Sequence, residues 1–569
     1  MHSPLSRFFL AVLPGLALCA PSIPHLEARC NNKSSPEPEP TVALSQGTYY
    51  GVHNSNYEQD FFLGIPYAQP PTGSLRFAAP QPLITPFSGR RNATEYSPMC
   101  IGYGSDTSNL GNYVSEDCLT INVVRPAGTS DKDKLPVAVW IHGGSYVMGG
   151  SRDPRYNLTW IVEQSVKEGK PMIAASINYR LSYWGFLFSS EMKEAGAGNV
   201  AFRDQRMAMQ WVQDNIAAFG GSPDKVTIWG ESAGARSIGM QLVAYDGNHD
   251  GLFRSAIMES GSPVAKFVEA DAWQPYFNAL VQKTGCGNST NSLNCLRALP
   301  WSTLNNFFNS TTALGVTAPA FSAVIDGDFM TAQGYKLLRE GNFAQVSLLV
   351  GNNFDEGTAY GKQGINNTAE FLSYVVSSGM QASLADTVGQ IYPDDPSVGI
   401  PASYEGRPPA YPYGLQFKRV AAFAGDVQQH SGRRLTAKSY TEASLPVYSY
   451  MWNVHVNGIA PIFGATHFQE VAFVFNNIEG LGYSVNPFAG EPETFKELAD
   501  MMSKMWVAFV HNGNPNLQNG SVQHIAWPRY TPDDPHNFVF DVNVTNLAYL
   551  DTDDYRQSGI DYLLENFYS

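Results

Sequence analysis

One serine in the chain has the sequence surroundings of a nucleophile, because it is the centre of the pentapeptide Gly230-Glu231-Ser232-Ala233-Gly234. Residues 226–229 are apolar, β-branched and aromatic, which predicts a short buried strand, and residues 233–243 predict a helix. A tight turn from strand to helix strains the backbone at the serine. At the positions two residues before and two residues after the serine, any side chain would collide, so glycine is expected there. The pentapeptide alone is a weak signal in a chain with 51 glycines, so its meaning depends on the partners that the chemistry requires.

A serine that attacks a carbonyl needs backbone N–H groups aimed at the oxyanion that forms. The stretch His142-Gly143-Gly144-Ser145 follows an apolar run at 137–141, and consecutive glycines let N–H groups approach a ligand without interference from Cβ atoms. A helix that begins at the serine directs its first N–H groups at the same place. We therefore assign the N–H groups of Gly143, Gly144 and Ala233 to an oxyanion hole.

The serine also needs a general base, and the base needs an orienting carboxylate. In strand-serine-helix enzymes the order along the chain is serine, acid, histidine. An acid is expected after the apolar run 348–350, where Asp355 and Glu356 are adjacent and composition does not choose between them. His467 is the best-placed base, because Gly464 lets its loop reach inward and an apolar stretch follows. The histidines beyond the acid loop are His430, His455, His467, His511, His524 and His536.

These residues must be positioned by a framework of alternating strands and helices. Helical periodicity predicts helices over 203–219 and 495–511, and two short segments at 41–51 and 59–63 predict an opening hairpin. The pattern indicates the α/β class, with a mostly parallel sheet covered on both faces. We expect one domain over 41–569 with long insertions. Buried strands are predicted at 137–141, 173–177, 226–229, 256–258, 348–350 and 447–451.

The first 40 residues have the pattern of an export signal and a leader. Arg7 precedes an apolar run at 8–19, which predicts a signal peptide over 1–20 that is too short to span a bilayer. Residues 21–40 form a polar, Pro-rich leader that we expect to lack fixed structure. A net charge of −15 argues against nucleic acid and anionic membranes as partners. We therefore expect a secreted, extracellular protein with no stable membrane anchor.

The cysteines fit an oxidising compartment. The pairs Cys100–Cys118 and Cys286–Cys295 are each close in sequence, so these two local disulfides are the simplest pairing, and Cys30 is left over in the leader. No two cysteines form a CxxC pair, which argues against zinc, and we expect no metal or cofactor. Sequons for N-glycosylation, consistent with secretion, occur at Asn32, Asn92, Asn157, Asn288, Asn309, Asn366, Asn519 and Asn543.

Longer segments around these residues share the pattern of one family. They are FLGIPYAQPPTGSLRF from Phe62, SEDCLTINVVRP from Ser115, LPVAVWIHGGSYVMGG from Leu135, NYRLSYWGFL from Asn178, GNVAFRDQRMAMQWVQDNIAAFGGSPDKVTIWGESAG from Gly198, SGSP from Ser260, NNFDEGT from Asn352 and FGATHFQE from Phe463. In these segments the chain resembles the type-B carboxylesterases, a branch of secreted esterases and lipases that includes the cholinesterases. The resemblance runs from about Thr41 to the C-terminal helix.

The resemblance implies an α/β-hydrolase fold and a Ser-Glu-His triad, with Ser232 as nucleophile, Glu356 as acid and His467 as base. It also implies that Ser260 supports the acid and the histidine by hydrogen bonding. Glu231 matches a structural carboxylate beside the nucleophile, and the two local disulfides match disulfides of the family.

The loop between Cys100 and Cys118 separates members of this family. Lipase-like members carry a long amphipathic lid there and cholinesterases a tryptophan, whereas residues 101–117 here are polar, Gly/Ser-rich and without tryptophan. We therefore expect a secreted serine carboxylesterase that hydrolyses small-molecule carboxylic esters through an acyl-enzyme. The alternatives are a lipase or sterol esterase of the same family and a non-catalytic adhesion-type member. The natural acyl and alcohol groups and the oligomeric state stay open.

Overall fold

The centre of the fold is an eleven-stranded sheet with the strand order β16-β15-β14-β13-β12-β11-β9-β10-β8-β4-β3. The run from β10 through β15 pairs in parallel, and the strands at both edges pair antiparallel. The predicted mostly parallel sheet is thereby confirmed. The strands are β3 (Val52–Asn54), β4 (Gln59–Pro66), β8 (Thr120–Pro126), β9 (Leu135–Ile141), β10 (Ile173–Ile177), β11 (Gly221–Glu231), β12 (Ser255–Glu259), β13 (Ser347–Asn353), β14 (Val447–Trp452), β15 (His536–Phe540) and β16 (Ala548–Thr552).

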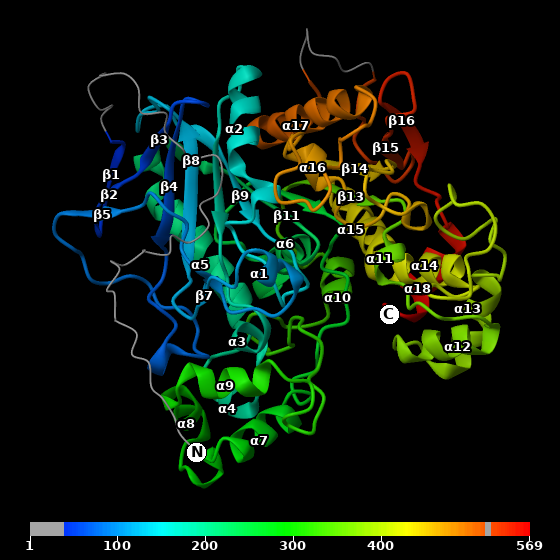
Figure 1. Cartoon of the computed structure of the whole chain (residues 1–569), viewed down its shortest axis with the longest axis horizontal. Coiled ribbons are helices and arrows are strands. Elements are labelled where there is room, and N and C mark those ends of the chain that lie inside the picture. The colour runs from blue at the N-terminus through cyan, green and yellow to red at the C-terminus, as the bar shows by residue number, and fades with distance from the viewer. Residues whose placement is uncertain (1–38, 518–524) are drawn as a thin grey trace, which may run out of the picture. The chain divides into compact units, whose positions relative to one another are not determined.

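Helices cover both faces of this sheet (Figure 1). On one face, α2 (Leu158–Lys167), α16 (Val471–Val474) and α17 (Thr494–Asn512) share a core with Trp229. On the other face, α5 (Val200–Asn215), α6 (Ala233–Val243) and α15 (Ser431–Glu442) share a core with Ile228. Successive side chains of a strand point to opposite faces, so adjacent residues of β11 contribute to the two separate layers.

Every predicted apolar run lies within a strand of the sheet, and the predicted helix 495–511 is present as α17. The helix predicted over 203–219 begins earlier, at Val200, and its last turn is a separate 3-10 helix, Ile216–Phe219, that ends at Gly220 with φ of 90°. Sequence reasoning missed β15 and β16, which follow α17 and close one edge of the sheet.

Shorter elements surround the sheet and form the insertions. The described cysteines pair as predicted, Cys100 with Cys118 and Cys286 with Cys295. The remaining strands are β1 (Thr41–Leu44), β2 (Gly47–Tyr50), β5 (Arg90–Asn92), β6 (Met99–Cys100) and β7 (Val114–Ser115). The remaining α-helices are α1 (Ser105–Asn109), α3 (Ser182–Phe186), α4 (Ser190–Glu194), α7 (Gln274–Lys283), α8 (Ser292–Ala298), α9 (Trp301–Phe308), α10 (Gly334–Arg339), α11 (Gly357–Tyr360), α12 (Thr368–Ser377), α13 (Ala385–Ile391), α14 (Phe417–Gly425) and α18 (Gln557–Asn566).

This computed structural model describes residues 39–517 and 525–569, and residues 39–569 cluster into one unit. The predicted signal peptide and nearly all of the predicted leader lie outside the described residues, as do Cys30, Asn32, Asn519 and the candidate base His524. The division of the chain into 1–20, 21–40 and 41–569 therefore stays a prediction. Within the described ranges, no helix has both the length and the apolar character to cross a bilayer.

Candidate active site

Ser232 lies at the turn between β11 and α6, close to the middle of the sheet. Its backbone has φ of 56° and ψ of −121°, an uncommon conformation for a residue with a side chain. A Cβ atom at Gly234 would collide with the carbonyl oxygen of Ile141, so the turn needs glycine at that position. The Ser232 backbone N–H donates to the carbonyl oxygen of Glu259 at 2.9 Å, which ties the strained turn to the neighbouring strand β12.

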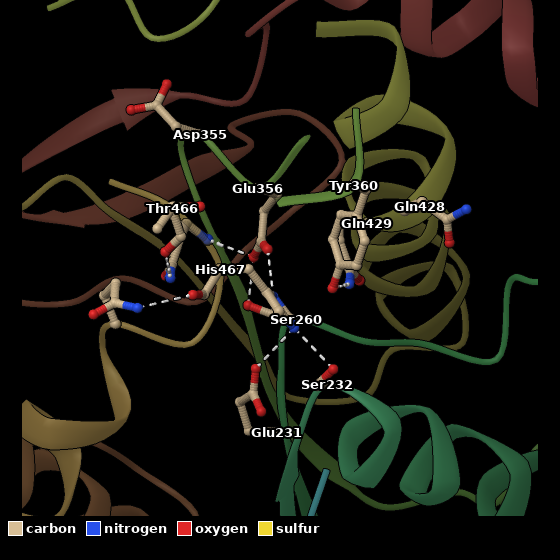
Figure 2. A network of polar contacts seen from close by, with 12 residues as sticks. Glu231, Ser232, Ser260, Asp355, Glu356, Tyr360, Gln428, Gln429, Thr466 and His467 are labelled. Atoms are coloured by element: carbon tan, nitrogen blue, oxygen red, sulfur yellow. Dashed lines mark hydrogen bonds and ion pairs between the residues drawn. The ribbon is translucent and has the colours of Figure 1, made fainter. Parts of the chain in front are cut away.

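Ser232, His467 and Glu356 form one continuous chain of contacts, although they are far apart in the sequence (Figure 2). The Ser232 Oγ atom lies 2.8 Å from Nε2 of His467. The Nδ1 atom of the same ring lies 2.7 Å from Oε2 of Glu356. Glu356 is fully buried, whereas the His467 side chain is 13% exposed. A hydroxyl, an imidazole and a carboxylate thus lie in contact one after another, and Ser232 at one end is partly exposed.

The second carboxylate oxygen of Glu356 is also held. Its Oε1 accepts hydrogen bonds from the hydroxyl of Ser260 and, at 2.9 Å, from the backbone N–H of Asn353. Ser260 is fully buried and, like Ser232, has a positive φ of 56°. These donors leave Oε2 free to face the imidazole and fix its direction.

Asp355, the other acid that composition allows, points away from His467 (Figure 2). Its Oδ2 accepts the backbone N–H of Ala465 at 2.8 Å, and its own backbone N–H donates to the carbonyl oxygen of Ala465 at 3.0 Å. A Cβ atom at Gly464 would collide with this carboxylate. Burial raises the pKa of Asp355 to about 6. Asp355 therefore holds the loop that carries the histidine, while Glu356 contacts the histidine itself.

Two further side chains contact the His467 ring. The ring of Tyr360 lies 5.0 Å from it between centroids, and the Tyr360 hydroxyl accepts a hydrogen bond from Nε2 of Gln429 at 3.0 Å. The Oε1 atom of Glu231 lies 3.2 Å from Nε2 of His467. The ring is thus restrained from the side as well as along its hydrogen-bonding axis, which keeps Nε2 directed at Ser232.

Gly143 and Ala233, two of the three residues predicted to donate to an oxyanion, lie next to Ser232. Gly143 follows β9, and a Cβ atom there would lie 3.1 Å from the Cβ of Ser232 and 2.8 Å from the carbonyl oxygen of Glu231. Gly144 has φ of 98°, and Ala233 is the first residue of α6. Substitution of Gly143 would therefore fill the space beside the nucleophile.

Three more carboxyl groups, those of Glu231, Glu259 and Glu470, are buried around this chain of contacts. Burial, followed by the charges of neighbouring carboxylates, raises the pKa values of Glu231 and Glu259 well above the ordinary range. The same two causes raise the pKa of Glu470 to about 7. The raised pKa values favour the neutral form of these groups, which limits the negative charge close to His467.

Sequence reasoning missed Glu259 and Glu470. The Oε1 atom of Glu259 accepts hydrogen bonds from the indole N–H groups of Trp229, at 2.6 Å, and Trp506, at 2.5 Å. Glu470 accepts one from Nδ2 of Asn353 at 2.5 Å. Both glutamates lie within three residues of a predicted site residue, which is the one signal that the sequence contained.

Replacement of Glu470 by Gln is expected to flatten the pH dependence of stability. A carboxyl group whose pKa rises from 4.5 to about 7 on folding stabilises the fold fully below about pH 4.5, and this contribution is lost as the pH rises through 7. The loss amounts to about 3 kcal/mol. The thermal unfolding midpoints at pH 5 and pH 8 should differ less in E470Q than in the wild type. Equal differences in both proteins would contradict the assignment, and E493Q, at an exposed site, is the matched control.

The loop between Cys100 and Cys118 is short and fixed by side chains. It contains one five-residue helix, α1, in which only Thr107 is buried, so it presents no apolar helical stripe. Hydrogen bonds and ion pairs connect it to three other parts of the chain: Arg76–Glu116 at 2.6 and 2.8 Å, Arg155–Asp106 at 2.7 Å and Tyr103–Asn305 at 2.8 Å.

Metal ligands do not gather in the described ranges: no three His, Cys, Asp or Glu side chains there are placed to hold an ion. The described site therefore offers a hydroxyl, an imidazole, a carboxylate and a Gly-rich loop.

Comparison with known proteins identifies the family. The model of the carboxylesterase family matches residues 38–556. Lipase 4 of Diutina rugosa is 34% identical over 93% of this chain and 96% of that protein. Secreted lipase 1 of Botryotinia fuckeliana (strain B05.10) is 34% identical over 93% of each chain. The crystal structure of EstA from Aspergillus niger superposes with a TM-score of 0.77 at 27% identity, over 93% of this chain and 99% of that one. The predicted α/β-hydrolase fold is thus confirmed, and the chain belongs to the carboxylesterase family and is a carboxylic ester hydrolase.

Proposed function

We propose that the chain is a serine esterase that works through an acyl-enzyme. Ser232 attacks the carbonyl carbon of the ester while Nε2 of His467 takes the hydroxyl proton. Glu356 accepts the hydrogen bond of Nδ1–H, which selects the productive tautomer and stabilises the imidazolium. His467 then protonates the departing alcohol, and the acyl group stays on Ser232.

The oxyanion formed in this attack is stabilised by backbone N–H groups of Gly143, Gly144 and Ala233, at the positive end of α6. Water enters once the alcohol leaves, and His467 acts as base again. A second tetrahedral intermediate collapses to release the acid and restores the Ser232 hydroxyl.

The observation that supports this mechanism most strongly is the continuous contact from Ser232 to His467 at 2.8 Å and from His467 to Glu356 at 2.7 Å. It also weighs against the non-catalytic adhesion-type alternative. To test this, the enzyme is quenched with acid while it turns over 4-nitrophenyl acetate. The good leaving group of this ester makes deacylation the slow step, so the acyl-enzyme accumulates. Intact mass should show one acetyl group per chain. Active enzyme that carries no acetyl group would contradict an acyl-enzyme.

We further propose that soluble esters are preferred to emulsified lipids. The loop of residues 101–117, where the amphipathic lid of a lipase would lie, is short and fixed by the contacts of Arg76, Asp106 and Tyr103. The rate on tributyrin should therefore rise smoothly through its solubility limit. A steep increase above that limit would favour the second candidate, a lipase, which the names of the two fungal relatives support.

Secretion and glycosylation are part of the same proposal. The two disulfides and the name of the Botryotinia relative support an extracellular location. Asparagines of the sequons that are exposed, and so open to glycosylation, are Asn92, Asn288, Asn309 and Asn543, while Asn157 and Asn366 are partly exposed.

A further inference from the structure

An arginine that the mechanism does not use lies one helical turn from the nucleophile. Arg236 is on α6, and its backbone N–H donates to the carbonyl oxygen of Ser232 at 2.8 Å. Ser232 is the N-cap of this helix, so Arg236 lies in the first turn after it. Helical side chains also lean toward the N-terminus. Since α6 begins directly after the nucleophile, this preference directs the Arg236 side chain toward the end of the helix where Ser232 lies.

The guanidinium of Arg236 has no carboxylate partner. Its Nη2 donates to the backbone oxygen of Gln428 at 3.0 Å and to the side-chain Oε1 of the same residue at 2.7 Å. Among the described residues, no Asp or Glu forms an ion pair with it, and its other nitrogens donate to no protein group. Arg236 is partly exposed and Gln428 is exposed. The remaining N–H groups can therefore reach solvent or a bound molecule.

The residues that hold Arg236 are continuous with those that hold His467. Gln428 is adjacent to Gln429, which donates to the hydroxyl of Tyr360, and Tyr360 contacts the His467 ring (Figure 2). Burial and then the charge of Glu356 raise the pKa of Tyr360, and the positive charge of Arg236 opposes this rise. The positive charge of Arg236 thus acts on a residue that contacts the His467 ring.

The other arginine close to the site is neutralised. Arg155 is paired with Asp106 and Asp153 at 2.7 and 2.6 Å. Arg236 therefore carries a positive charge that no described carboxylate pairs with, one helical turn from the nucleophile, in a chain whose net charge is −15. Such a guanidinium is suited to a carboxylate, which it binds through paired N–H groups.

We propose that Arg236 binds a carboxylate group of the substrate, so that the enzyme favours esters whose acyl or alcohol part carries a negative charge. Gln428 holds the guanidinium in place through two hydrogen bonds. This inference rests on the proposed serine esterase function and adds a substrate class to it.

The test compares matched esters with and without the charge. On the acyl side, mono-4-nitrophenyl glutarate is compared with 4-nitrophenyl valerate, and on the alcohol side 4-acetoxybenzoate is compared with 4-acetoxybenzamide. R236M should lower kcat/KM for the charged ester of one pair by roughly 10–100-fold, mainly through KM, because a charge-assisted hydrogen bond is lost. Its kcat/KM for the neutral esters should change less than about threefold, which also shows that the variant is folded.

Two control variants distinguish the effect of the Arg236 charge from other effects of a substitution. R236K keeps the positive charge and should retain part of the preference. R407M, at an exposed arginine paired with Asp394, should leave the ratio of charged to neutral rates unchanged. A ratio in R236M within twofold of wild type for both pairs would overturn the inference while leaving the esterase function intact. Wild-type protein inactive on all four esters would overturn both.

Discussion

Replacement of Ser232 by Ala is expected to lower kcat by roughly 10⁴–10⁶-fold on any ester that the wild type hydrolyses. The reason is that no other hydroxyl is placed 2.8 Å from the Nε2 of His467 among the described residues. Activity that remains would come from the oxyanion donors and from substrate binding. The substitution removes one hydrogen bond and leaves the backbone turn in place, so the unfolding midpoint should stay close to that of the wild type.

The measurement for S232A is the rate of 4-nitrophenolate release, with the thermal unfolding midpoint as the control for folding. A decrease of less than tenfold in a folded variant would show that another residue is the nucleophile. If S232A lost all activity and also had a lower midpoint, S232C would distinguish loss of the nucleophile from loss of folding. This variant keeps a nucleophilic atom at the same position and should retain measurable acylation.

Replacement of Glu356 by Gln is expected to lower kcat by roughly 10³–10⁴-fold. An amide has no charge with which to stabilise the imidazolium, and its NH₂ group can oppose the Nδ1–H of His467. The amide still accepts the hydrogen bonds of Ser260 and Asn353, so the fold should be little affected. The kcat of E356Q is measured with the same 4-nitrophenyl ester.

The adjacent acid supplies the matched control. D355N should lower kcat less than tenfold, because Asp355 accepts the N–H of Ala465 and does not contact the imidazole. The amide oxygen of Asn can accept the same hydrogen bond. A larger effect of D355N than of E356Q on kcat, with both variants folded, would reverse the assignment of the acid.

Local patterns in the sequence were sufficient for the parts of the site that depend on backbone geometry. A strand, a strained serine and a helix are encoded within residues 226–243, and the Gly-rich stretch after β9 is equally local. The apolar runs located the parallel strands because a central strand is buried on both faces. The family resemblance, not composition, favoured Glu356 over Asp355.

Contacts that depend on packing between distant segments could not be predicted in this way. Nothing local indicates that Trp506 donates to Glu259 or that Asn353 donates to Glu470. The position of Arg236 one turn from the nucleophile is local, but its contact with Gln428 in place of a carboxylate depends on a segment that is distant in the sequence. Such features require the tertiary structure because they depend on burial and on which groups are left unpaired.

The most direct test of the central claim is covalent labelling with diethyl 4-nitrophenyl phosphate, followed by peptide mass spectrometry. An activated serine attacks this phosphate ester and keeps the diethylphosphoryl group, whereas ordinary serines do not react. We predict one adduct per chain, on Ser232, formed in parallel with the loss of esterase activity and absent in E356Q over the same period. Loss of activity with the adduct on a different residue, or with Ser232 unmodified, would contradict the account.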